Sequence, residues 1–344
     1  MRIFDRSFDL TDVDAALFAA VLAKQDRLAI PIAQVDPDGI GSAMGLAAIA
    51  RHLGVESDVM YAGSFGHPQT RMLWETFGLG DRITRFSGIA PESSVALVDS
   101  SQTKDARFGG VELSPAIIID HHGAALRDLT GDRFHYVAPC GAASSIVALL
   151  GMMLSVPFDS ETCTLLALGI QTDTFGLTGI STGPMDRAMF ASLMETGDQG
   201  ALYRLSRFSM SERAFSIVQR LLTHKAIHGH GVLVAQPATL LDESEGEYLA
   251  FAADLLSGHK DARLVLVLGV AGDTIRVCAR TREPSFPLGE VLHQLFGEGS
   301  GAKPGSGGAC VILPYVLRGS RRRDDKFRVF LEQLEERIAA LELP

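Results

Sequence analysis

The stretch Ile117-Ile118-Ile119-Asp120-His121-His122 constrains the fold of this chain more than any other. Three consecutive β-branched apolar residues are typical of a buried strand. In a parallel α/β sheet, ligands bind at the carboxyl ends of the strands. The Asp-His-His triplet that follows therefore predicts three metal- or phosphate-binding groups within one turn of chain. The alternative is a solvent-exposed loop in which Asp120 caps a helix.

Three further segments of the first half repeat this pattern, in which an apolar run leads to one or two carboxylates. They are Leu28–Ala33 before Asp36 and Asp38, Val95–Val98 before Asp99, and the helix-like run Thr162–Ile170 before Asp173. Pro31 inside the first run indicates an edge strand or a local irregularity. One such segment alone is equally typical of a surface turn; for Asp36 and Asp38 this alternative is an Asp-Pro-Asp-Gly turn with Ser42 as a helix cap. Four of them predict that the carboxylates converge on one site.

Carboxylate oxygen together with imidazole nitrogen suits Mn²⁺, Fe²⁺ or Zn²⁺ better than Ca²⁺. Several carboxylates at one place need two metal ions to balance their charge, and two-metal sites catalyse phosphoryl hydrolysis. The chain has 31 basic and 41 acidic residues, a net charge of −10, which argues against binding long duplex nucleic acid. A small anionic substrate, held by metal ions and a few local cations, stays compatible with this charge.

The length of 344 residues is enough for two domains with separate cores. The four cysteines are scattered without a CxxC pair, so neither a zinc knuckle nor a disulfide framework is indicated. The amino-terminal residues lack the apolar core of a signal peptide. Residues 140–158, the one stretch to check as a membrane span, fit a buried helix better. We therefore expect a cytoplasmic protein without a membrane partner.

The pattern changes in the second half, where the strand-like runs 231–235, 264–270 and 273–279 alternate with a helix over 246–256. The sequence predicts an α/β fold with a parallel-sheet catalytic domain over residues 1–190, a helical linker over 191–224 and a smaller α/β domain over 225–344. The substrate is expected in a cleft between the two domains. An apolar stripe from Phe327 to Leu341 predicts a terminal helix that docks on its own domain or forms a homodimer.

Residues 297–309 are rich in glycine, and Arg280 follows the last strand-like run. A glycine-rich loop lets backbone N–H groups approach a phosphate, to which Arg280 and Lys303 would add positive charge. The spacing is not that of a P-loop, because Lys303 precedes a proline. The alternative for this segment is a flexible surface loop.

Taken together, four motifs of the first half resemble those of the DHH phosphoesterase superfamily. The motifs are Asp36-Pro-Asp38-Gly-Ile-Gly-Ser, Leu97-Val98-Asp99-Ser100, Asp120-His121-His122 and Thr172-Asp173-Thr174. Their order and spacing agree with that superfamily over roughly the first 190 residues. The group includes RecJ-type exonucleases, family II pyrophosphatases and the bacterial phosphoesterases of nanoRNA and 3′-phosphoadenosine-5′-phosphate.

The resemblance implies a site for two Mn²⁺ ions, with Mg²⁺ or another divalent ion as the alternative. The implied ligands are Asp36 and Asp99 for the first ion, and Asp38, Asp99, His121 and Asp173 for the second. Asp120 and His122 would have catalytic roles, in which Asp120 orients His121 and His122 contacts the substrate phosphate. The second domain resembles the companion DHHA1 domain, in which an arginine and a Gly-Gly-His loop grip the nucleotide. This implies substrate contacts for Arg280, Gly307 and Gly308, with Lys303 in the place of that histidine.

The chain departs from the family pattern four residues before Asp36, where a histidine ligand of the first metal is usual. Ile32 occupies that position and cannot ligate, and the nearby Gln34 does not restore an acid. The first metal is therefore weakly held, held with more water molecules, or absent.

We expect a metal-dependent phosphoesterase of small nucleotides, such as short single-stranded oligoribonucleotides, 3′-phosphoadenosine-5′-phosphate or linear dinucleotides. One alternative is a catalytically weakened protein that binds a nucleotide as a sensor, which the departure at Ile32 favours. Another is hydrolysis of inorganic pyrophosphate or short polyphosphate, since Arg280 and the glycine-rich segment suit either ligand.

Overall fold

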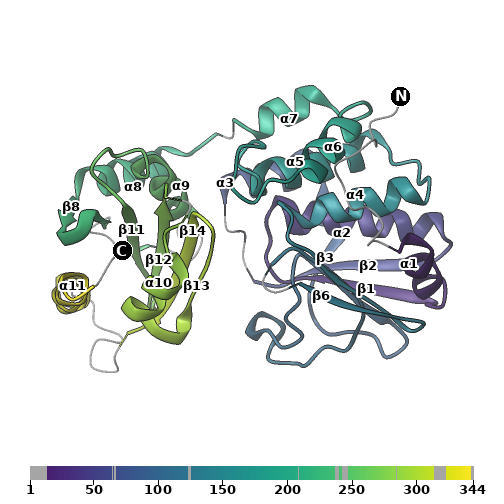
Figure 1. The fold of residues 1–344 in the computed structure, drawn as a ribbon, viewed down its shortest axis with the longest axis horizontal. Coiled ribbons are helices and arrows are strands. Elements are labelled where there is room, and N and C mark those ends of the chain that lie inside the picture. Colours follow the sequence, from purple (N-terminus) through teal and green to yellow (C-terminus); the bar gives the residue numbers. More distant parts are fainter. Residues whose placement is uncertain are drawn as a thin grey trace. The chain divides into compact units, whose positions relative to one another are not determined.

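The computed structural model describes residues 14–63, 65, 67–122, 125–207, 209–236, 240–241, 247–283, 285–313 and 323–341. The chain divides into two compact units, Met1–Phe208 and Ser209–Pro344, and each has its own sheet and core (Figure 1). The boundary falls within residues 191–224, which the sequence assigns to a helical linker. In that stretch, α7 (Gln199–Leu205) belongs to the first unit and α8 (Glu212–Thr223) to the second.

The first unit is built on a seven-stranded sheet with the order β3-β2-β1-β4-β5-β7-β6. Every neighbouring pair is parallel except β6 and β7, which confirms a mostly parallel α/β domain. The strands are β1 (Arg27–Ile32), β2 (Glu56–Tyr61), β3 (Ile83–Arg85), β4 (Ser94–Val98), β5 (Pro115–Asp120), β6 (Leu126–Thr130) and β7 (Arg133–Val137).

The expectation of an edge strand at Pro31 is wrong, because β1 lies between β2 and β4 in the interior of the sheet. The alternative, a local irregularity, fits the pairing. The ladder with β4 covers only Leu28 and Ala29, so it ends before the residue that has no N–H to donate.

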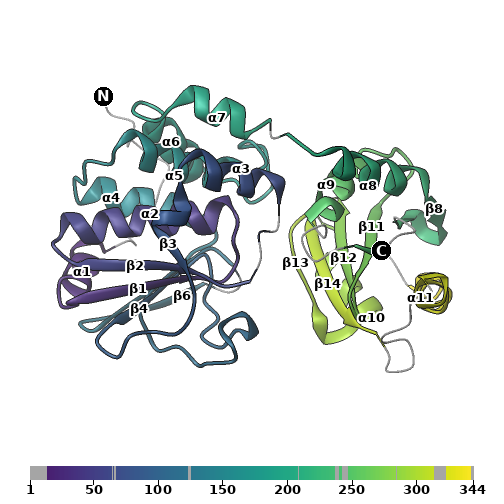
Figure 2. The ribbon, with the colours of Figure 1, turned by 180° about the vertical axis from the view of Figure 1, so that it is seen from behind.

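Helices cover one face of this sheet, as Figure 2 shows from behind. They are α1 (Ala15–Leu22), α2 (Pro37–His52), α3 (Pro68–Thr76), α4 (Ala143–Met153), α5 (Ser160–Asp173), α6 (Pro184–Leu193) and α7. Among them, α2 and α4 contact the strands, while α5 packs on α2 and α4. This packing brings the end of α5 close to the start of α2.

Two glycines allow the close approach of α2, α4 and α5. A Cβ atom on Gly41 would lie 2.6 Å from the carbonyl oxygen of Leu165, and one on Gly169 would lie 2.5 Å from Oγ of Ser144 and 3.0 Å from Cα of Asp38. No larger side chain fits either position without moving a helix. The glycines therefore set the distance between the carboxylates that these helices carry.

The second unit contains another sheet, with the order β13-β14-β12-β11-β9-β8 and the short β10 beside β11. Its strands are β8 (Lys225–His228), β9 (Val232–Ala235), β10 (Leu240–Leu241), β11 (Leu264–Ala271), β12 (Thr274–Thr281), β13 (Ser300–Lys303) and β14 (Ser306–Ile312). Its helices are α8, α9 (Glu247–Leu256), α10 (Leu288–Phe296) and α11 (Arg323–Ala339). Alternate residues of β9 and β11 enter separate apolar clusters, so both faces of this sheet are covered.

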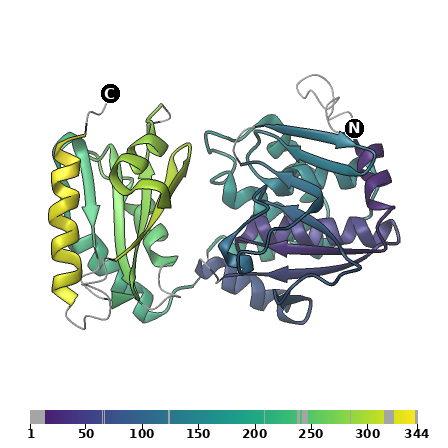
Figure 3. The same ribbon diagram turned by 90° about the horizontal axis from the view of Figure 1, so that it is seen from below.

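The glycine-rich segment is a β-hairpin, so the expectation of a loop over residues 297–309 is wrong. Strands β13 and β14 pair antiparallel around the turn at Pro304-Gly305, where Gly305 has a φ of 83°. The stripe of the last helix docks on its own unit, because Leu334, Ile338 and Leu341 are buried in one cluster with β11 and α10 (Figure 3). Within the part of the chain that the structure describes, no helix has both the length and the apolarity needed to cross a bilayer.

Candidate metal centre

The acidic motifs of the first unit meet at the carboxyl ends of β1, β4 and β5, which are neighbouring parallel strands. Asp36 is the N-cap of α2 and Asp38 lies in its first turn. Asp99 follows β4 with a φ of 55°, a left-handed value that non-glycine residues rarely adopt. Such a backbone costs about 1–3 kcal/mol and is typical of functional sites.

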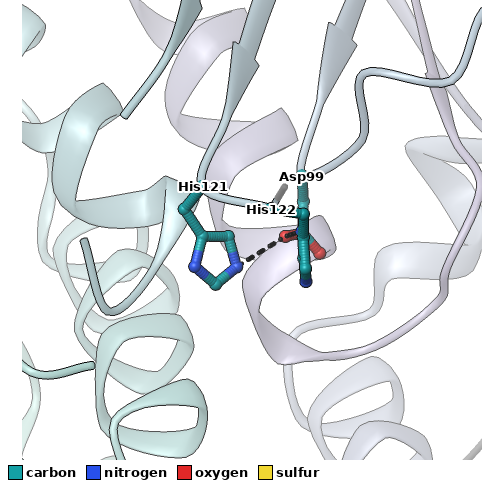
Figure 4. A group of neighbouring side chains, drawn as sticks. All are labelled: Asp99, His121 and His122. Carbon is teal, nitrogen blue, oxygen red and sulfur yellow. Dashed lines mark ion pairs between the residues drawn. The ribbon is translucent and has the colours of Figure 1, made fainter. Parts of the chain in front are cut away.

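Three carboxylates surround one imidazole nitrogen. The Nε2 atom of His121 lies 3.2 Å from Oδ1 of Asp99, 3.4 Å from Oδ2 of Asp173 and 3.7 Å from Oδ2 of Asp38 (Figure 4 shows His121, His122 and Asp99). Ligand atoms held about 2.1 Å from a shared ion lie about 3.0–3.5 Å from one another in octahedral or tetrahedral geometry. The spacing around His121 is therefore that of groups arranged to share a cation.

The hydrogen bonds of this centre support the same reading. Nδ1 of His121 donates to the carbonyl oxygen of Cys140 at 3.2 Å, and in this tautomer the lone pair of the ring lies on Nε2. Among the described residues, this buried Nε2 and the buried Oδ1 of Asp99 have no hydrogen-bond partner. Buried polar atoms are seldom left unsatisfied, so two neighbouring ones fit a metal ion.

Asp38 also belongs to the scaffold. Its Oδ2 accepts a hydrogen bond from the backbone N–H of Ala143 at 2.7 Å, and its Oδ1 accepts one from Ser144 at 2.8 Å. These N–H groups belong to the first turn of α4, whose own N-cap residue, Ala142, offers no side-chain cap. Asp38 thus caps α4 from a distance and keeps further lone pairs for a ligand.

Asp120 orients His122 rather than the ring of His121, so the expectation that it orients His121 is wrong. Its Oδ1 accepts from Nδ1 of His122 at 2.9 Å and from the backbone N–H groups of His121 and His122. Burial raises the pKa of Asp120, but the hydrogen bonds from His122 and Ser101 outweigh it and leave the pKa below its usual value. The same bond raises the pKa of His122, whose side chain is 45% exposed.

The remaining carboxylates repel one another. Burial and the charge of Asp173 raise the pKa of Asp36 to about 6, and the same two causes raise the pKa of Asp38. Burial, followed by the charges of Asp38 and Asp36, holds the pKa of Asp99 well above its usual value. Desolvated like charges of this kind call for a cation to offset them.

The ligand set of the first implied metal is smaller than that of the second. Asp36 is not among the groups whose ligand atoms lie within 4.8 Å of one another, which are Asp38 with His121 and Asp173, and Asp99 with His121 and His122. Its oxygens accept hydrogen bonds from the backbone N–H of Gly39 and from the amide of Gln34, each at 2.9 Å. Ile32 is 1% exposed in the apolar core.

The predicted substrate residues of the second unit lie on neighbouring strands of its sheet. Arg280 and Lys303 both pair with Ser306, and Nε of Arg280 donates to Asp254 at 2.5 Å. A Cβ atom on Gly307 would lie 2.8 Å from the backbone carbonyl oxygen of Gly301, so this glycine is required by packing. These residues are held in a regular ladder, and the glycines do not form an open phosphate-binding loop.

A cavity of about 310 Å³ beside the metal centre was not predicted from the sequence. Its lining includes Ser101, Gln102 and Arg107, which follow Asp99 in the chain. The sequence carried one signal for it, the polar run Ser100-Ser101-Gln102 directly after a predicted ligand. Composition alone did not distinguish that run from a surface turn.

Comparison with known proteins gives consistent matches. The model of the DHH family, N-terminal domain, matches residues 30–170. An uncharacterized protein of Methanocaldococcus jannaschii is 28% identical over 264 residues, which cover 77% of this chain and 54% of that protein. A probable manganese-dependent inorganic pyrophosphatase of Streptococcus mutans is 24% identical, over 67% of this chain and 78% of that protein. The chain thus spans about half the length of the archaeal relative.

A solved structure shares the fold. The exopolyphosphatase-related protein from Bacteroides fragilis superimposes with a TM-score of 0.71 and 17% sequence identity, covering 94% of this chain and 95% of that one. At this identity, the likeness shows the two-domain α/β architecture and leaves the chemistry to the site itself.

Proposed function

This chain belongs to the DHH superfamily through its first unit, and on that premise we propose that it is a metal-dependent phosphoesterase of small nucleotides. The observation that carries the proposal is the contact of Asp38, Asp99 and Asp173 with Nε2 of His121. The substrates we propose are short oligoribonucleotides, 3′-phosphoadenosine-5′-phosphate and linear dinucleotides. The net charge of −10 favours such short substrates over long duplex nucleic acid.

Asp38, Asp99, His121 and Asp173 would hold a divalent cation, with Mn²⁺ or Mg²⁺ as the ions that suit their oxygen-rich set. Such a cation supplies positive charge for the phosphoryl oxygens and a water molecule of lowered pKa. Hydrogen bonds fix the side chains of His121 and Asp38, and the packing of α5 on α2 fixes the position of Asp173. These residues would therefore hold the cation in place. The smaller set around Asp36 predicts weaker binding of a further ion.

His122 is the residue best placed to contact a phosphate. Its Nδ1–H is held by Asp120, and its half-exposed ring leaves Nε2 to face a ligand. The hydrogen bond to Asp120 raises the pKa of His122 and so favours the protonated ring, whose Nε2–H would donate to a phosphoryl oxygen or to the leaving oxygen. Asp120 itself is buried and remains an acceptor throughout.

The second unit has two cations of its own that suit a nucleotide phosphate. Arg280 is oriented by Asp254, and Lys303 lies across the same hairpin ladder, so both cations are attached to regular strands. Fixed cations lose less conformational entropy on binding than cations on a flexible loop. We propose that these residues bind a phosphate group of a nucleotide.

The test is a substrate panel with the full chain and Mn²⁺. A 5′-phosphorylated dinucleotide, 3′-phosphoadenosine-5′-phosphate, a short oligoribonucleotide and inorganic pyrophosphate are each assayed for released product. We expect turnover of at least one nucleotide and its loss in Asp99→Asn, while Asp132→Asn keeps full activity because that side chain is 91% exposed. Metal content of the purified variants separates loss of the ion from loss of the fold.

The other outcomes identify the alternatives. Turnover of pyrophosphate alone selects a pyrophosphatase, the activity named for the streptococcal relative. Saturable nucleotide binding without turnover, in protein that has bound Mn²⁺, selects a sensor. Absence of both turnover and Mn²⁺ binding refutes the proposal.

A further inference from the structure

The cavity of about 310 Å³ joins the metal centre to a fixed guanidinium group. Its lining includes Asp99, Asp120 and His122 of the metal centre together with Gln102 and Arg107. The volume is at the lower end of the range for small-ligand sites, about 300–1,000 Å³. Because the reacting phosphate would sit at the metal centre, whatever fills this cavity is an adjacent part of the same substrate.

Arg107 is positioned before any ligand arrives. Its Nε donates to Asp105 at 2.9 Å and 3.1 Å, and its Nη2 donates to the same carboxylate at 2.6 Å. Asp105 is itself buried, and its Oδ1 also accepts from the backbone N–H of Arg107 at 2.8 Å. The described residues provide no partner for Nη1, and the side chain keeps 40% of its exposure. One edge of the guanidinium is therefore locked and the other is available.

The carboxylates of Asp99 and Asp120 also line this cavity. With a cation at the metal centre to offset them, the polar lining and Arg107 favour an anionic group. Ser100, Ser101, Gln102 and Gln34 offer hydroxyl and amide groups, and Ala33 is the one apolar residue of this lining. It includes no phenyl, phenol or indole ring, so the planar groups on which a base could stack are the imidazole of His122 and the guanidinium of Arg107. Arginine with hydroxyl and amide donors is the set that proteins use for phosphate.

We propose that this cavity binds a second phosphate group of the substrate, and that Arg107 recognises it. Asp105 is the positioning residue that aims the guanidinium. The inference rests on the proposed function and narrows its substrates to those with two neighbouring phosphate groups. These are 5′-phosphorylated dinucleotides, 3′,5′-bisphosphates and pyrophosphate, as opposed to simple phosphodiesters.

The test compares two substrates in the same variants. One is a 5′-phosphorylated dinucleotide and the other is the p-nitrophenyl ester of a nucleoside 5′-phosphate, which has a single phosphate. We expect Arg107→Gln to raise KM for the first substrate roughly 10- to 100-fold, the effect of one lost charge-assisted hydrogen bond. For the second substrate KM should change less than about twofold, since that contact is not made. Arg133→Gln, another arginine paired with an aspartate in this unit, should leave both values unchanged.

Further variants separate recognition from folding. Arg107→Lys keeps the charge but not the fork, so we expect an intermediate rise in KM for the dinucleotide. Asp105→Asn should raise the same KM with kcat and Mn²⁺ affinity unchanged, a split that a general loss of structure does not produce. Equal losses for both substrates, or no loss in Arg107→Gln, would overturn the assignment while leaving the phosphoesterase proposal intact.

Binding of imidodiphosphate, which resists hydrolysis, tests the cavity without turnover. Isothermal titration of the Mn²⁺-loaded protein should show at least tenfold weaker binding in Arg107→Gln than in wild type. If wild type hydrolyses no substrate but this difference is found, the cavity assignment stands and the phosphoesterase proposal fails. If the two proteins bind imidodiphosphate equally, the cavity assignment fails.

Discussion

Replacing Asp99 by asparagine is expected to shift stability in opposite directions with and without metal. The side chain of Asp99 is 5% exposed, and burial and its acidic neighbours raise the pKa of its carboxyl. Between the unfolded and the raised folded pKa, the native state binds more protons than the unfolded one, so stability falls as pH rises. At neutral pH, the metal-free wild type is therefore destabilised by this group, and an amide of the same shape relieves that cost.

The size of the effect follows from the geometry. Oxygens of Asp99 and Asp38 lie 3.2 Å and 3.7 Å from the same nitrogen, which places them within about 7 Å of each other. Two unit charges at that distance repel by about 2 kcal/mol at an effective dielectric constant near 20. We expect metal-free Asp99→Asn to gain about 1–3 kcal/mol, or about 2–10 °C in Tm for a unit of this size.

Bound metal reverses the order. At a free Mn²⁺ concentration of 100 Kd, the wild type gains about 2.7 kcal/mol, which corresponds to about 5–10 °C. The variant has lost a ligand, so its Tm should change by less than about 1 °C. Thermal melts in EDTA and in Mn²⁺ measure both effects, with Asp132→Asn as the surface control. A variant that melts below wild type in EDTA, or that keeps the wild-type response to Mn²⁺, would refute the reasoning.

Three further predictions concern the first metal, pH and the hairpin. Ile32→His places an imidazole four residues before Asp36, and the number of Mn²⁺ ions bound per chain in titration calorimetry should rise by about one. An unchanged number contradicts the idea that the first site is weakened by the missing histidine. The pKa of Asp36 is about 6 without metal, so the affinity of any ion bound by Asp36 should fall about tenfold for each pH unit below that value. Equal affinities in titrations at pH 5 and pH 7 count against Asp36 as a ligand. Gly307→Ala should cost about 1–3 kcal/mol in urea unfolding, since its Cβ would lie 2.8 Å from the backbone carbonyl oxygen of Gly301. Gly301→Ala meets nothing within 4 Å and should cost under about 0.5 kcal/mol.

Apolar periodicity was enough to predict most of the fold. The runs before Asp99 and Asp120 are central parallel strands, and the run before Asp173 is a helix that ends at that residue. The local hydrophobic pattern alone predicts their positions, because a strand that is buried on both faces needs an almost continuous run of apolar residues. The convergence of the carboxylates then follows from the shared edge of a parallel sheet.

Features that depend on long-range pairing were not predictable. The local composition of the glycine-rich segment is typical of a loop. The segment forms a pair of strands because β14 pairs with β12, which is distant in the sequence. Pro31 is tolerated inside the sheet because β4 stops pairing before it, which no local pattern reveals. The side-chain partner of Asp120 is the histidine whose ring turns toward it. His121 and His122 are adjacent and identical in type, so the sequence does not indicate which of the two rings this is.

The double role of Asp38 determines which variants can test the metal centre. Its two oxygens hold the first turn of α4, while Oδ2 also faces Nε2 of His121. Removing that carboxylate deletes a ligand and leaves two buried N–H groups unpaired, which costs about 1–3 kcal/mol for each. Lost activity in Asp38→Ala would therefore not distinguish a missing ligand from a displaced α4. Asp99 is the position where ligation is separable from folding, because its Oδ1 accepts no hydrogen bond from a helix end among the described residues.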